Sequence, residues 1–373
     1  MPSLPRVTVR DIAEKAGVHF TTVSLALRQS PRLKAATRER VLQIAESMGY
    51  RPDPMLAALN AYRKSCRPAH YQATIAWIHN WPSPEQLYRN GEFSQYYAGA
   101  SERAQERGYM IEEFWLREAG MTVEKLHRIL RARNIQGTLL APQPLANIYL
   151  DLRYDELSAV AFGYTMQPAV LDLVSNHHVH TMKLLLQKVL ELGYRRIGLV
   201  IPSEWDAKVE HAWQSGLLLL QAQRPDLARL PILWDIWDNE ETKELEAWTK
   251  EHRPDVVISF HTTAHRLRSI GYRVPQDIGF ACPFLDNNDY YLSGVHQNGR
   301  LIGRKAVDMV VDMIHRRETG IPETPVRVLV EGTWQPGKTL QRQEPASAKS
   351  ERRKTGRIKK PKAVKSTGRK PPK

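Results

Sequence analysis

Apolar side chains recur at helical spacing in three short runs near the start of the chain, at residues 9–16, 20–28 and 35–48. Within each run they fall three or four positions apart, which places them on one face of a helix. Gly17 and Gly49 follow the first and third runs, where a left-handed residue commonly ends a helix. The predicted inward-facing residues of these three helices are Val9, Ile12, Ala13, Ala16, Val23, Leu27, Val41, Ile44, Ala45 and Met48.

The first of these helices also has a start signal. Thr8 precedes it and Asp11 lies three positions further on, so the two side chains are predicted to form a capping box. A helix, a tight turn at Gly17 and a second helix match the helix-turn-helix pattern, in which the second helix enters the DNA major groove. The alternative is a plain three-helix bundle, which the short turn and the basic charge of this segment make the weaker interpretation.

Residues 51–71 are predicted to form a hinge helix and linker between this headpiece, residues 1–50, and the rest of the chain. Asp53 can cap a helix and Pro54 suits its first position. So short a helix is not stable alone, and we expect it to form only with a partner chain or DNA. Its apolar residues are Met55, Leu56 and Leu59.

Between residues 72 and 344 short apolar runs alternate with amphipathic stretches. Alternating strands and helices are typical of doubly wound parallel sheets, and a core of this length suits two lobes better than one sheet. The predicted fold is therefore an all-α headpiece followed by an α/β core of two doubly wound lobes. Strands are predicted at 74–80, 137–142, 159–163, 196–202, 255–260 and 277–282, and helices at 92–107, 122–133, 178–192, 205–222 and 300–317.

The net charge of +14 is unevenly spread along the chain. Residues 1–64 carry 11 Lys and Arg against 5 Asp and Glu, residues 345–373 carry 12 against 1, and residues 65–344 carry 31 against 34. Basic ends on a near-neutral body favour a polyanionic partner, most often nucleic acid. The tail, residues 345–373, is expected to be disordered, and a purely solubilising role is its alternative interpretation.

The sequence also predicts the compartment and argues against catalysis. No window approaches the ~18 uninterrupted apolar residues of a transmembrane helix, the first residues lack a signal-peptide pattern, and the two cysteines, Cys66 and Cys282, suggest a reducing compartment. Common phosphate-binding, nucleophile and zinc-protease motifs are missing. Histidines at 177–180 and 261–265 have spacings that a metal could use, but without matching Cys or acidic residues they are better explained as solvated or pocket-mouth histidines. We expect a cytoplasmic protein that is not an enzyme and has no cofactor or metal.

Four motifs occur together in residues 7–54: V-T-x-x-D-I-A-x-x-A-G-V, T-V-S-x-A-L, T-R-x-R-V and M-G-Y-R-P. With them the chain resembles the headpiece and hinge of the lactose-repressor (LacI/GalR) family of bacterial transcription regulators. The resemblance implies base reading by Phe20, Thr21 and Leu25, and a wedge at Leu59 that enters the minor groove and kinks the DNA. It implies phosphate contacts at His19, Thr22, Ser24, Arg28, Thr37 and Tyr50, and Thr8 and Lys34 complete the expected DNA-contacting set.

Three positions depart from the family pattern. Leu25 stands where many members have Arg, which can pair with guanine, whereas Leu can read only by apolar contact. Lys34 replaces the Ser that usually caps the third helix, so a cap is lost and a phosphate contact becomes available. Asp53 stands where Asn is common. These departures leave DNA binding expected and the operator sequence open.

The core shows the same resemblance at residues 190–201, 272–281 and 294–314. It implies a regulatory core shaped like the periplasmic sugar-binding proteins, with a ligand cleft between two hinged lobes. The tail lacks the leucine heptads that tetramerise some family members, so we expect a homodimer.

The cleft residues follow from two arguments. Side chains at the carboxyl ends of parallel strands face the ligand crevice, and the resemblance adds the position of Trp213, where sugar-binding members usually have Arg, and Gln297, where the chain recrosses. The usual Asn-Asp pair is replaced by Phe260 and His261. Abundant tryptophans offer stacking platforms for a sugar, although most of them could instead be core residues. The expected effector-binding residues are His79, Asn80, Trp81, Ser203, Trp205, Trp213, His261 and Gln297.

The sequence therefore predicts a dimeric transcription regulator, of the repressor kind, in the bacterial cytoplasm and associated with the nucleoid. It is expected to bind a pseudo-palindromic operator, with an affinity controlled by a small effector that is a sugar or a sugar derivative. One alternative is an architectural DNA-binding protein with a vestigial pocket. A solute-binding protein is a further alternative, which the headpiece opposes.

Overall fold

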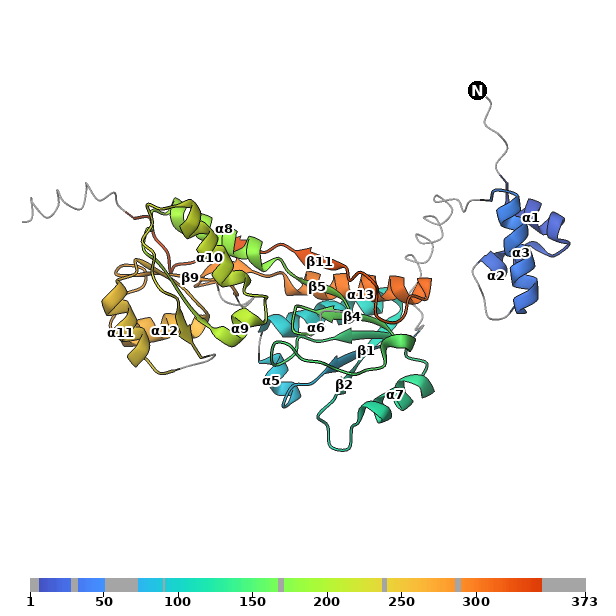
Figure 1. Ribbon diagram of the computed structural model, residues 1–373, viewed down its shortest axis with the longest axis horizontal. Coiled ribbons are helices and arrows are strands. Elements are labelled where there is room, and N and C mark those ends of the chain that lie inside the picture. The colour runs from blue at the N-terminus through green and yellow to red at the C-terminus, as the bar shows by residue number, and fades with distance from the viewer. Residues whose placement is uncertain are drawn as a thin grey trace, which may run out of the picture. The chain divides into compact units, whose positions relative to one another are not determined.

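The computed structural model describes residues 7–27, 33–50, 73–89, 91–166, 171–236, 240–285 and 290–343. The chain divides into two compact units, residues 1–70 and 71–373, which we describe one at a time (Figure 1). The predictions made for Arg28, Leu59, Cys66, the hinge helix and the tail lie outside the described residues.

The first unit contains three short helices, α1 (Val9–Ala16), α2 (Phe20–Leu27) and α3 (Ala35–Ser47) (Figure 1). Each helix contributes one fully buried β-branched residue to a common core. These residues are Ile12, Val23 and Val41, and the alanines buried around them are Ala13, Ala16, Ala26 and Ala45. Because the core is built from small side chains, the helices pack closely on one another, and Leu27, Ile44 and Met48 cover its edge while remaining only half-buried.

The turns of this unit are set by local hydrogen bonds and by backbone conformation. The backbone N–H of Thr8 donates to the Asp11 carboxylate at 2.7 Å, and the Asp11 N–H donates to the Thr8 hydroxyl at 3.3 Å, so the predicted capping box is confirmed. Gly17 has a φ of +64° and ends α1 in the left-handed conformation, also as predicted. At the start of α3, Lys34 makes no side-chain capping bond.

The second unit begins with lobe one, whose six strands are all parallel in the order β11-β5-β4-β3-β1-β2. Helices α5, α6 and α13 contribute to the hydrophobic cluster on one face of the sheet, and α7 packs on the other face. The strands are β1 (Ala73–His79), β2 (Tyr109–Trp115), β3 (Gly137–Leu140), β4 (Ser158–Phe162), β5 (Asp172–Asn176) and β11 (Arg327–Val330). The helices are α5 (Pro84–Tyr88), α6 (Gly91–Arg107), α7 (Val123–Ala132), the 3-10 helix η1 (Tyr154–Glu156) and α13 (Gly299–Arg316).

Lobe two repeats this plan with the strand order β12-β10-β9-β8-β6-β7, in which only β12 runs antiparallel to its neighbour. Helices α8 and α10 cover one face and α11 and α12 the other. The strands are β6 (Ile197–Pro202), β7 (Leu233–Asp235), β8 (Val256–Ile258), β9 (Gly279–Cys282), β10 (Ser293–His296) and β12 (Thr333–Gln335). The helices are α8 (His178–Glu191), α9 (Ser203–Ala207), α10 (Ala212–Gln223), α11 (Lys243–His252) and α12 (His261–Ser269).

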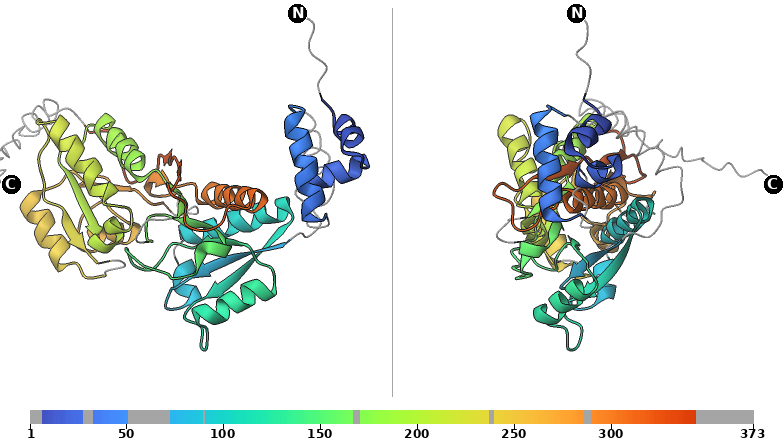
Figure 2. Two further views of the ribbon diagram at one scale, coloured as in Figure 1. Left: turned by 45° about the vertical axis from the view of Figure 1, so that its right-hand side comes forward. Right: turned by 90° about the vertical axis from the view of Figure 1, so that its right-hand side faces the viewer.

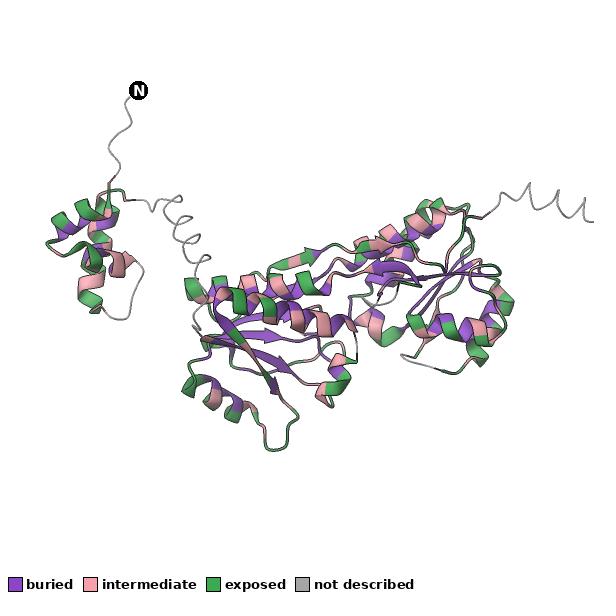
Figure 3. Ribbon diagram, turned by 180° about the vertical axis from the view of Figure 1, so that it is seen from behind, coloured by how far each residue is buried: buried purple, intermediate pink, exposed green. Residues whose placement is uncertain are grey.

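Both sheets are covered on both faces, so their central strands are buried along nearly their whole length (Figure 3). This burial explains why those strands are continuous apolar runs rather than alternating ones. The predicted class, a helical headpiece followed by two doubly wound lobes, is confirmed, and each of the six predicted strands is present. The structure adds six strands that the apolar pattern did not predict, namely β2, β5, β7, β10, β11 and β12.

Helices α6 and α13 of lobe one lie side by side in Figures 1 and 2, and two glycines allow their close contact. A Cβ atom on Gly99 of α6 would lie 2.1 Å from the carbonyl oxygen of Arg300, and one on Gly303 of α13 would lie 2.0 Å from that of Tyr96. No real Cβ contact is that short, so any larger residue would push the two helices apart. The pair fixes how α6, which carries cleft residues, sits on its sheet.

The chain passes between the lobes three times, after β5, after β10 and after β11. The side chain of Asn176, the last residue of β5, joins the three crossings. Its amide donates to the carbonyl oxygens of Gln297 at 3.3 Å and Val330 at 3.1 Å, and its own oxygen accepts from the Thr181 hydroxyl at 2.7 Å. Asn176 is fully buried, so these bonds are shielded from water.

Candidate functional site

Three exposed side chains lie at the start of α2: His19, directly before the helix, and Phe20 and Thr21 in its first turn. Phe20 is 48% exposed although it is large and apolar, and its ring centroid lies 4.3 Å from that of His19. The Nδ1 atom of His19 lies 2.8 Å from the Thr21 hydroxyl, within hydrogen-bond distance. These contacts order an apolar ring and two polar groups on the solvent side of the helix, where they could contact bases and phosphates.

The opposite side of α2 is anchored by Val23 and Ala26, which are buried against α1 and α3. The remaining predicted DNA contacts are distributed around this anchored helix. Thr8 and Lys34 are exposed, and Thr22, Ser24, Leu25, Thr37 and Tyr50 are half-buried. The Thr8 hydroxyl already donates to the Asp11 carboxylate at 2.8 Å, and hydrogen bonds from Thr8 hold the pKa of Asp11 below its usual value.

One positioning residue of this unit escaped the sequence analysis. The guanidinium of Arg40, on α3, donates to the carbonyl oxygen of Ala16 at 3.2 Å, at the end of α1. The bond ties α3 to the turn that precedes α2. In the sequence Arg40 is one basic residue among many. Its positioning role is visible only when the three helices are packed together.

In the second unit, side chains from both lobes surround a cavity of about 40 Å³. Its size suits a few water molecules rather than a sugar, so the cleft is closed. From lobe one the lining residues are Phe93, Tyr96, Pro142, Gly163, Thr165 and Ser175. From lobe two and the crossings they are His178, Trp205, Lys208, Val209, Trp213, Phe284 and Gln297.

Aromatic rings form the main contact across this cleft. The ring of Phe93, on α6 of lobe one, is stacked on that of Trp205, on α9 of lobe two, with centroids 6.1 Å apart and planes at 10°. Phe284 meets both rings edge-on, with centroids at 6.5 and 6.3 Å. Such arrangements stabilise the contact beyond simple area burial. The rings therefore join the two lobes across the cleft.

The polar groups of the cleft are few and strongly buried. Lys208 is 5% exposed, and burial lowers its pKa to about 7. Burial, with a smaller contribution from the neighbouring His177, lowers the pKa of His178 to about 3, so this imidazole is neutral at physiological pH. The Nε2 atom of His178 lies 3.4 Å from the Ser175 hydroxyl. With a pKa of about 7, the Lys208 amine is only partly protonated near neutral pH, so the cleft presents one ionisable amine among neutral donors and acceptors.

The structure brings some of the predicted effector-binding residues together and separates others. Trp205, Trp213 and Gln297 line the cavity, and the ring of Trp81 lies beside it, 5.1 Å from the Lys208 ammonium. The other four are not among the lining residues. His79 lies 3.2 Å from a Glu113 oxygen, Asn80 accepts from Arg117 at 3.1 Å, and Ser203 and His261 are exposed at the first residues of α9 and α12.

Lys208, Phe93, His178 and Phe284 are cleft residues that the sequence analysis did not single out. Lys208 lies in the charged stretch SEWDAKVEH, which looks like a solvated helix end. Phe93 belongs to the first turn of α6 and follows no strand directly. Lys208 and Phe93 are buried because the two lobes meet. The hydrophobic periodicity of a single segment cannot predict that contact.

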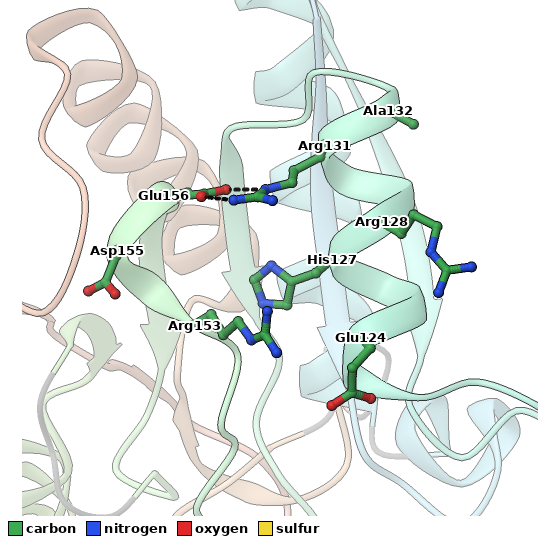
Figure 4. A pocket seen from close by; sticks show the side chains of 8 residues that line it. All are labelled: Glu124, His127, Arg128, Arg131, Ala132, Arg153, Asp155 and Glu156. Carbon is green, nitrogen blue, oxygen red and sulfur yellow. Dashed lines mark hydrogen bonds and ion pairs between the residues drawn. The ribbon is translucent and has the colours of Figure 1, made fainter.

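A second, larger hollow of about 720 Å³ lies on lobe one between α7 and η1 (Figure 4). Most of its side chains are charged, and Figure 4 shows Arg131 and Glu156 meeting across it while Arg128 and Asp155 point away from it. The Arg131 guanidinium donates to Glu156 at 2.6 Å, and the ring of His127 contacts the backbone carbonyl of Leu152. None of the predicted effector-binding residues lines it, and its exposed ion pair adds little stability.

Two searches of the described residues gave negative results. Among the helices of the described ranges, none is long and apolar enough to cross a membrane. In the same ranges, no three His, Cys, Asp or Glu side chains are grouped so that they could hold a metal ion.

Comparison with protein families finds two matching domains. Residues 8–53 match the model of bacterial regulatory proteins of the lacI family. Residues 186–340 match a periplasmic binding protein-like domain.

Curated relatives match over most of the chain or over its first unit. The transcriptional repressor PurR of Vibrio parahaemolyticus is 22% identical over 83% of this chain and 93% of its own length. The transcriptional regulator CelR of Thermobifida fusca is 24% identical over 87% and 96%. The probable repressor ExuR of Bacillus subtilis is 47% identical over 47 residues, 13% of this chain and 14% of its own.

Solved structures share the fold over most of the chain. A complex of the regulator CelR with cellobiose is similar with a TM-score of 0.55 and 21% identity, covering 90% of this chain and 100% of that one. The lac repressor dimer bound to its operator and the anti-inducer ONPF is similar with a TM-score of 0.55, 17% identity and the same coverage.

Proposed function

The chain belongs to the lacI family of bacterial regulatory proteins, and we propose that it binds a pseudo-palindromic operator as a homodimer under the control of a small effector. It is a regulator of transcription with a helix-turn-helix DNA-binding domain and an effector-binding domain of the periplasmic-binding-protein kind, and it is not an enzyme. Its proposed place is the nucleoid, in the bacterial cytoplasm.

The observation that carries the DNA-binding part is the first turn of α2. His19, Phe20 and Thr21 are exposed and ordered by contacts with one another, while Val23 and Ala26 anchor the helix from below. No acidic residue lies in that first turn, so its positive helix end is available to phosphates. Paired headpieces would contact two half-sites about one helical turn apart.

Selection from random duplex DNA with the full-length protein tests this part. The expected product is an inverted repeat, because two identical headpieces read two identical half-sites. Phe20→Ala should weaken or alter the selection, whereas Gln43→Ala, an exposed change on α3, should leave it unchanged. Selection of a one-sided or sequence-independent product would favour an architectural DNA-binding protein instead.

The effector part rests on the cleft between the lobes. The ring stack of Phe93 on Trp205 and an ion pair between Arg327 and Glu210, at 3.1 Å, hold the lobes closed. A ligand larger than water must part these contacts, so its binding would change the angle between the lobes. We propose that the hinge, residues 51–71, transmits this change to the headpieces. The evidence for this step is the sequence of the hinge, which predicts a short helix that is not stable alone.

We propose a sugar or a sugar derivative as the effector. Flat aromatic faces at Trp205, Phe93 and Trp81 suit the apolar faces of a sugar ring. The similar regulator CelR is bound to cellobiose in its solved structure, which supports a carbohydrate ligand for this fold.

The small cavity favours one alternative, a DNA-binding protein whose cleft is permanently filled by its own rings. About 40 Å³ of free space is what such a vestigial pocket would show. A thermal-shift screen of sugars and their acidic derivatives, followed by operator binding in the presence of each hit, separates the two functions. A ligand that both stabilises the protein and changes operator affinity supports regulation, and a screen without any hit supports the alternative.

A further inference from the structure

Lys208 places its amine inside the cleft among aromatic rings from both lobes. Its ammonium nitrogen lies 4.2 Å from the ring centroid of Trp205 in lobe two, and 5.1 and 5.5 Å from those of Trp81 and Phe93 in lobe one. It makes one long hydrogen bond, at 3.4 Å, to the carbonyl oxygen of Pro144. Three ring faces attract a cation, but they do not neutralise its charge.

The acidic side chains next to Lys208 along the chain point to other partners. Asp206 is fully buried, and its Oδ1 atom accepts the backbone N–H of Trp213 at 3.2 Å. Glu210 pairs with Arg327 at 3.1 Å. Across the part of the chain that the structure describes, no carboxylate lies within ion-pair distance of the Lys208 ammonium.

Within the described ranges, no ion pair joins this ammonium to the other elements around the cleft either. On α6, the Glu92 carboxylate is directed at the start of α13, where its Oε1 would lie 2.5 Å from a Cβ atom on Gly299. Burial raises the pKa of the Tyr96 phenol, and burial lowers the pKa of His178 to about 3, so both are uncharged at physiological pH. Among the described residues, Lys208 is therefore a buried amine without a counter-ion, and when it is protonated its charge destabilises the closed cleft unless something supplies one.

Further polar atoms of the same cavity also lack a hydrogen-bond partner within the described ranges. They are the indole Nε1 of Trp213, the Nδ1 of His178 and the side-chain oxygen of Gln297, all of them buried. One is a donor, one an acceptor, and the imidazole nitrogen can be either. Buried polar groups normally have partners, so this set points to a polar molecule that occupies the open cleft.

Resting on the effector-controlled function proposed above, we propose that the effector carries an acidic group, a carboxylate or a phosphate, which binds the Lys208 ammonium between the aromatic rings. The remaining polar atoms would hydrogen-bond the hydroxyl groups of the same molecule, and the rings would cover its apolar faces. The ligand class is thus an acidic sugar derivative, such as a sugar acid or a sugar phosphate. A charge-assisted bond to the buried ammonium would make the acidic group the main determinant of affinity.

Matched sets of ligands test the proposal with the full-length protein. Calorimetry and thermal shift would compare glucose, glucuronate and glucose 6-phosphate, then the corresponding galactose set, then ribose and ribose 5-phosphate. We expect an acidic member of at least one set to bind tenfold or more tightly than its neutral parent. The carboxylate and phosphate arms show which acidic group the cleft accepts.

Two variants assign the effect to the side chain. Lys208→Met keeps the length of the side chain and removes its charge, and should lose at least tenfold in affinity for the acidic ligand. Lys183→Met, on the exposed side of α8, is the matched control and should bind as the wild type does. Equal binding of a neutral parent, or undiminished binding of the acid by Lys208→Met, overturns the proposal but leaves effector control standing. A screen in which no sugar of either kind binds overturns both.

A measurement without ligand adds an independent check. Burial lowers the pKa of Lys208 from 10.5 to about 7, so the folded protein holds this proton less tightly than the unfolded chain. Wild-type stability should therefore rise as pH increases from about 7 towards 10.5. Lys208→Met should have the higher melting temperature at pH 6, and its advantage should shrink towards pH 10. A variant that melts below the wild type throughout this range would show that the ammonium supports the closed cleft, contrary to the proposal.

Discussion

The start of α2 and the cleft between the lobes differ in whether the residues that would contact a ligand also stabilise the fold. At α2, the exposed residues His19 and Phe20 are distinct from the buried residues, such as Val23, that hold the helix in place. In the cleft, Phe93 and Trp213 line the cavity and also belong to the hydrophobic cores of their lobes. A surface of the first kind can change its specificity without changing its stability, whereas in the second kind the two are coupled.

Two lysines show the same contrast. Lys34 is exposed at the start of α3, where water solvates its charge at no cost to folding. Lys208 is buried among rings, so its charge affects both folding and any ligand that enters the cleft. The position of a residue relative to water, more than its type, determines how many properties one substitution alters.

The largest expected effect compares two phenylalanines. Phe93→Ala should lower the free energy of unfolding of the core by about 4 kcal/mol, because it removes a buried ring from a packed cluster. Phe20→Ala should change stability by less than about 0.5 kcal/mol, since that ring is 48% exposed. Urea denaturation of the full-length variants gives both values. Similar losses of unfolding free energy in the two variants would contradict the proposed difference between the cleft and the start of α2.

The next effect probes the small core beneath α2. Ile12→Ala should destabilise the first unit by about 3 kcal/mol, because few other side chains can fill the space that it leaves. DNA binding should be lost while the core keeps its stability. Hydrogen exchange of the full-length protein, followed by mass spectrometry, resolves peptides of the two units. Ile44→Ala, at a half-buried position of α3, is the control and should have a clearly smaller effect.

A substitution at Leu25 should change specificity without changing the fold. Leu25 is half-buried on α2, so a long side chain placed there can extend towards the DNA. Leu25→Arg should shift the preference at one position of each half-site towards guanine by about 1–3 kcal/mol. Selection of the wild-type sequence by this variant would mean that Leu25 packs against the headpiece and does not read bases.

The smallest expected effect concerns a cap. Thr8→Ala removes one partner of the Asp11 capping box and should destabilise the first unit by about 1 kcal/mol. Thr8→Ser keeps the hydroxyl and should restore most of that stability. If Thr8→Ala weakens DNA binding more than its effect on hydrogen exchange explains, then Thr8 also contacts DNA directly.

The headpiece was predictable because its signals are local. The Thr8 and Asp11 cap, the left-handed Gly17 and the helical spacing of Ile12, Val23 and Val41 all lie within a few residues of what they determine. The family motifs strengthen the same interpretation.

The strands that were missed lack a local signal. Strand β2 is at the edge of its sheet and has Glu112 and Glu113 in its middle, while β7 and β12 contain three residues each. An edge strand needs fewer apolar residues, and a very short strand shows no period at all. Their existence depends on neighbouring strands that lie elsewhere in the sequence.

The cleft shows the same limit more sharply. The rule that strand ends face the crevice nominated Trp205, which does line the cavity, but also His79 and Asn80, which lie at the end of β1 and are not among the lining residues. Trp213 and Gln297 came instead from the family resemblance. Lys208 was missed because its burial depends on rings from both lobes. A site formed between two lobes is a property of their contact.

The hydrogen bonds of Asn176 have a mechanical consequence. One amide fastens three chain crossings at a single place, so the lobes cannot slide past one another without breaking it. Rotation about that place leaves these bonds intact, so hinge bending is the movement of the lobes that they favour. A molecule that enters the cleft would then act on the rest of the second unit chiefly by changing the angle between the lobes. Substitutions among the rings of the cleft could therefore change which ligand binds, while the movement of the lobes that follows binding stayed the same.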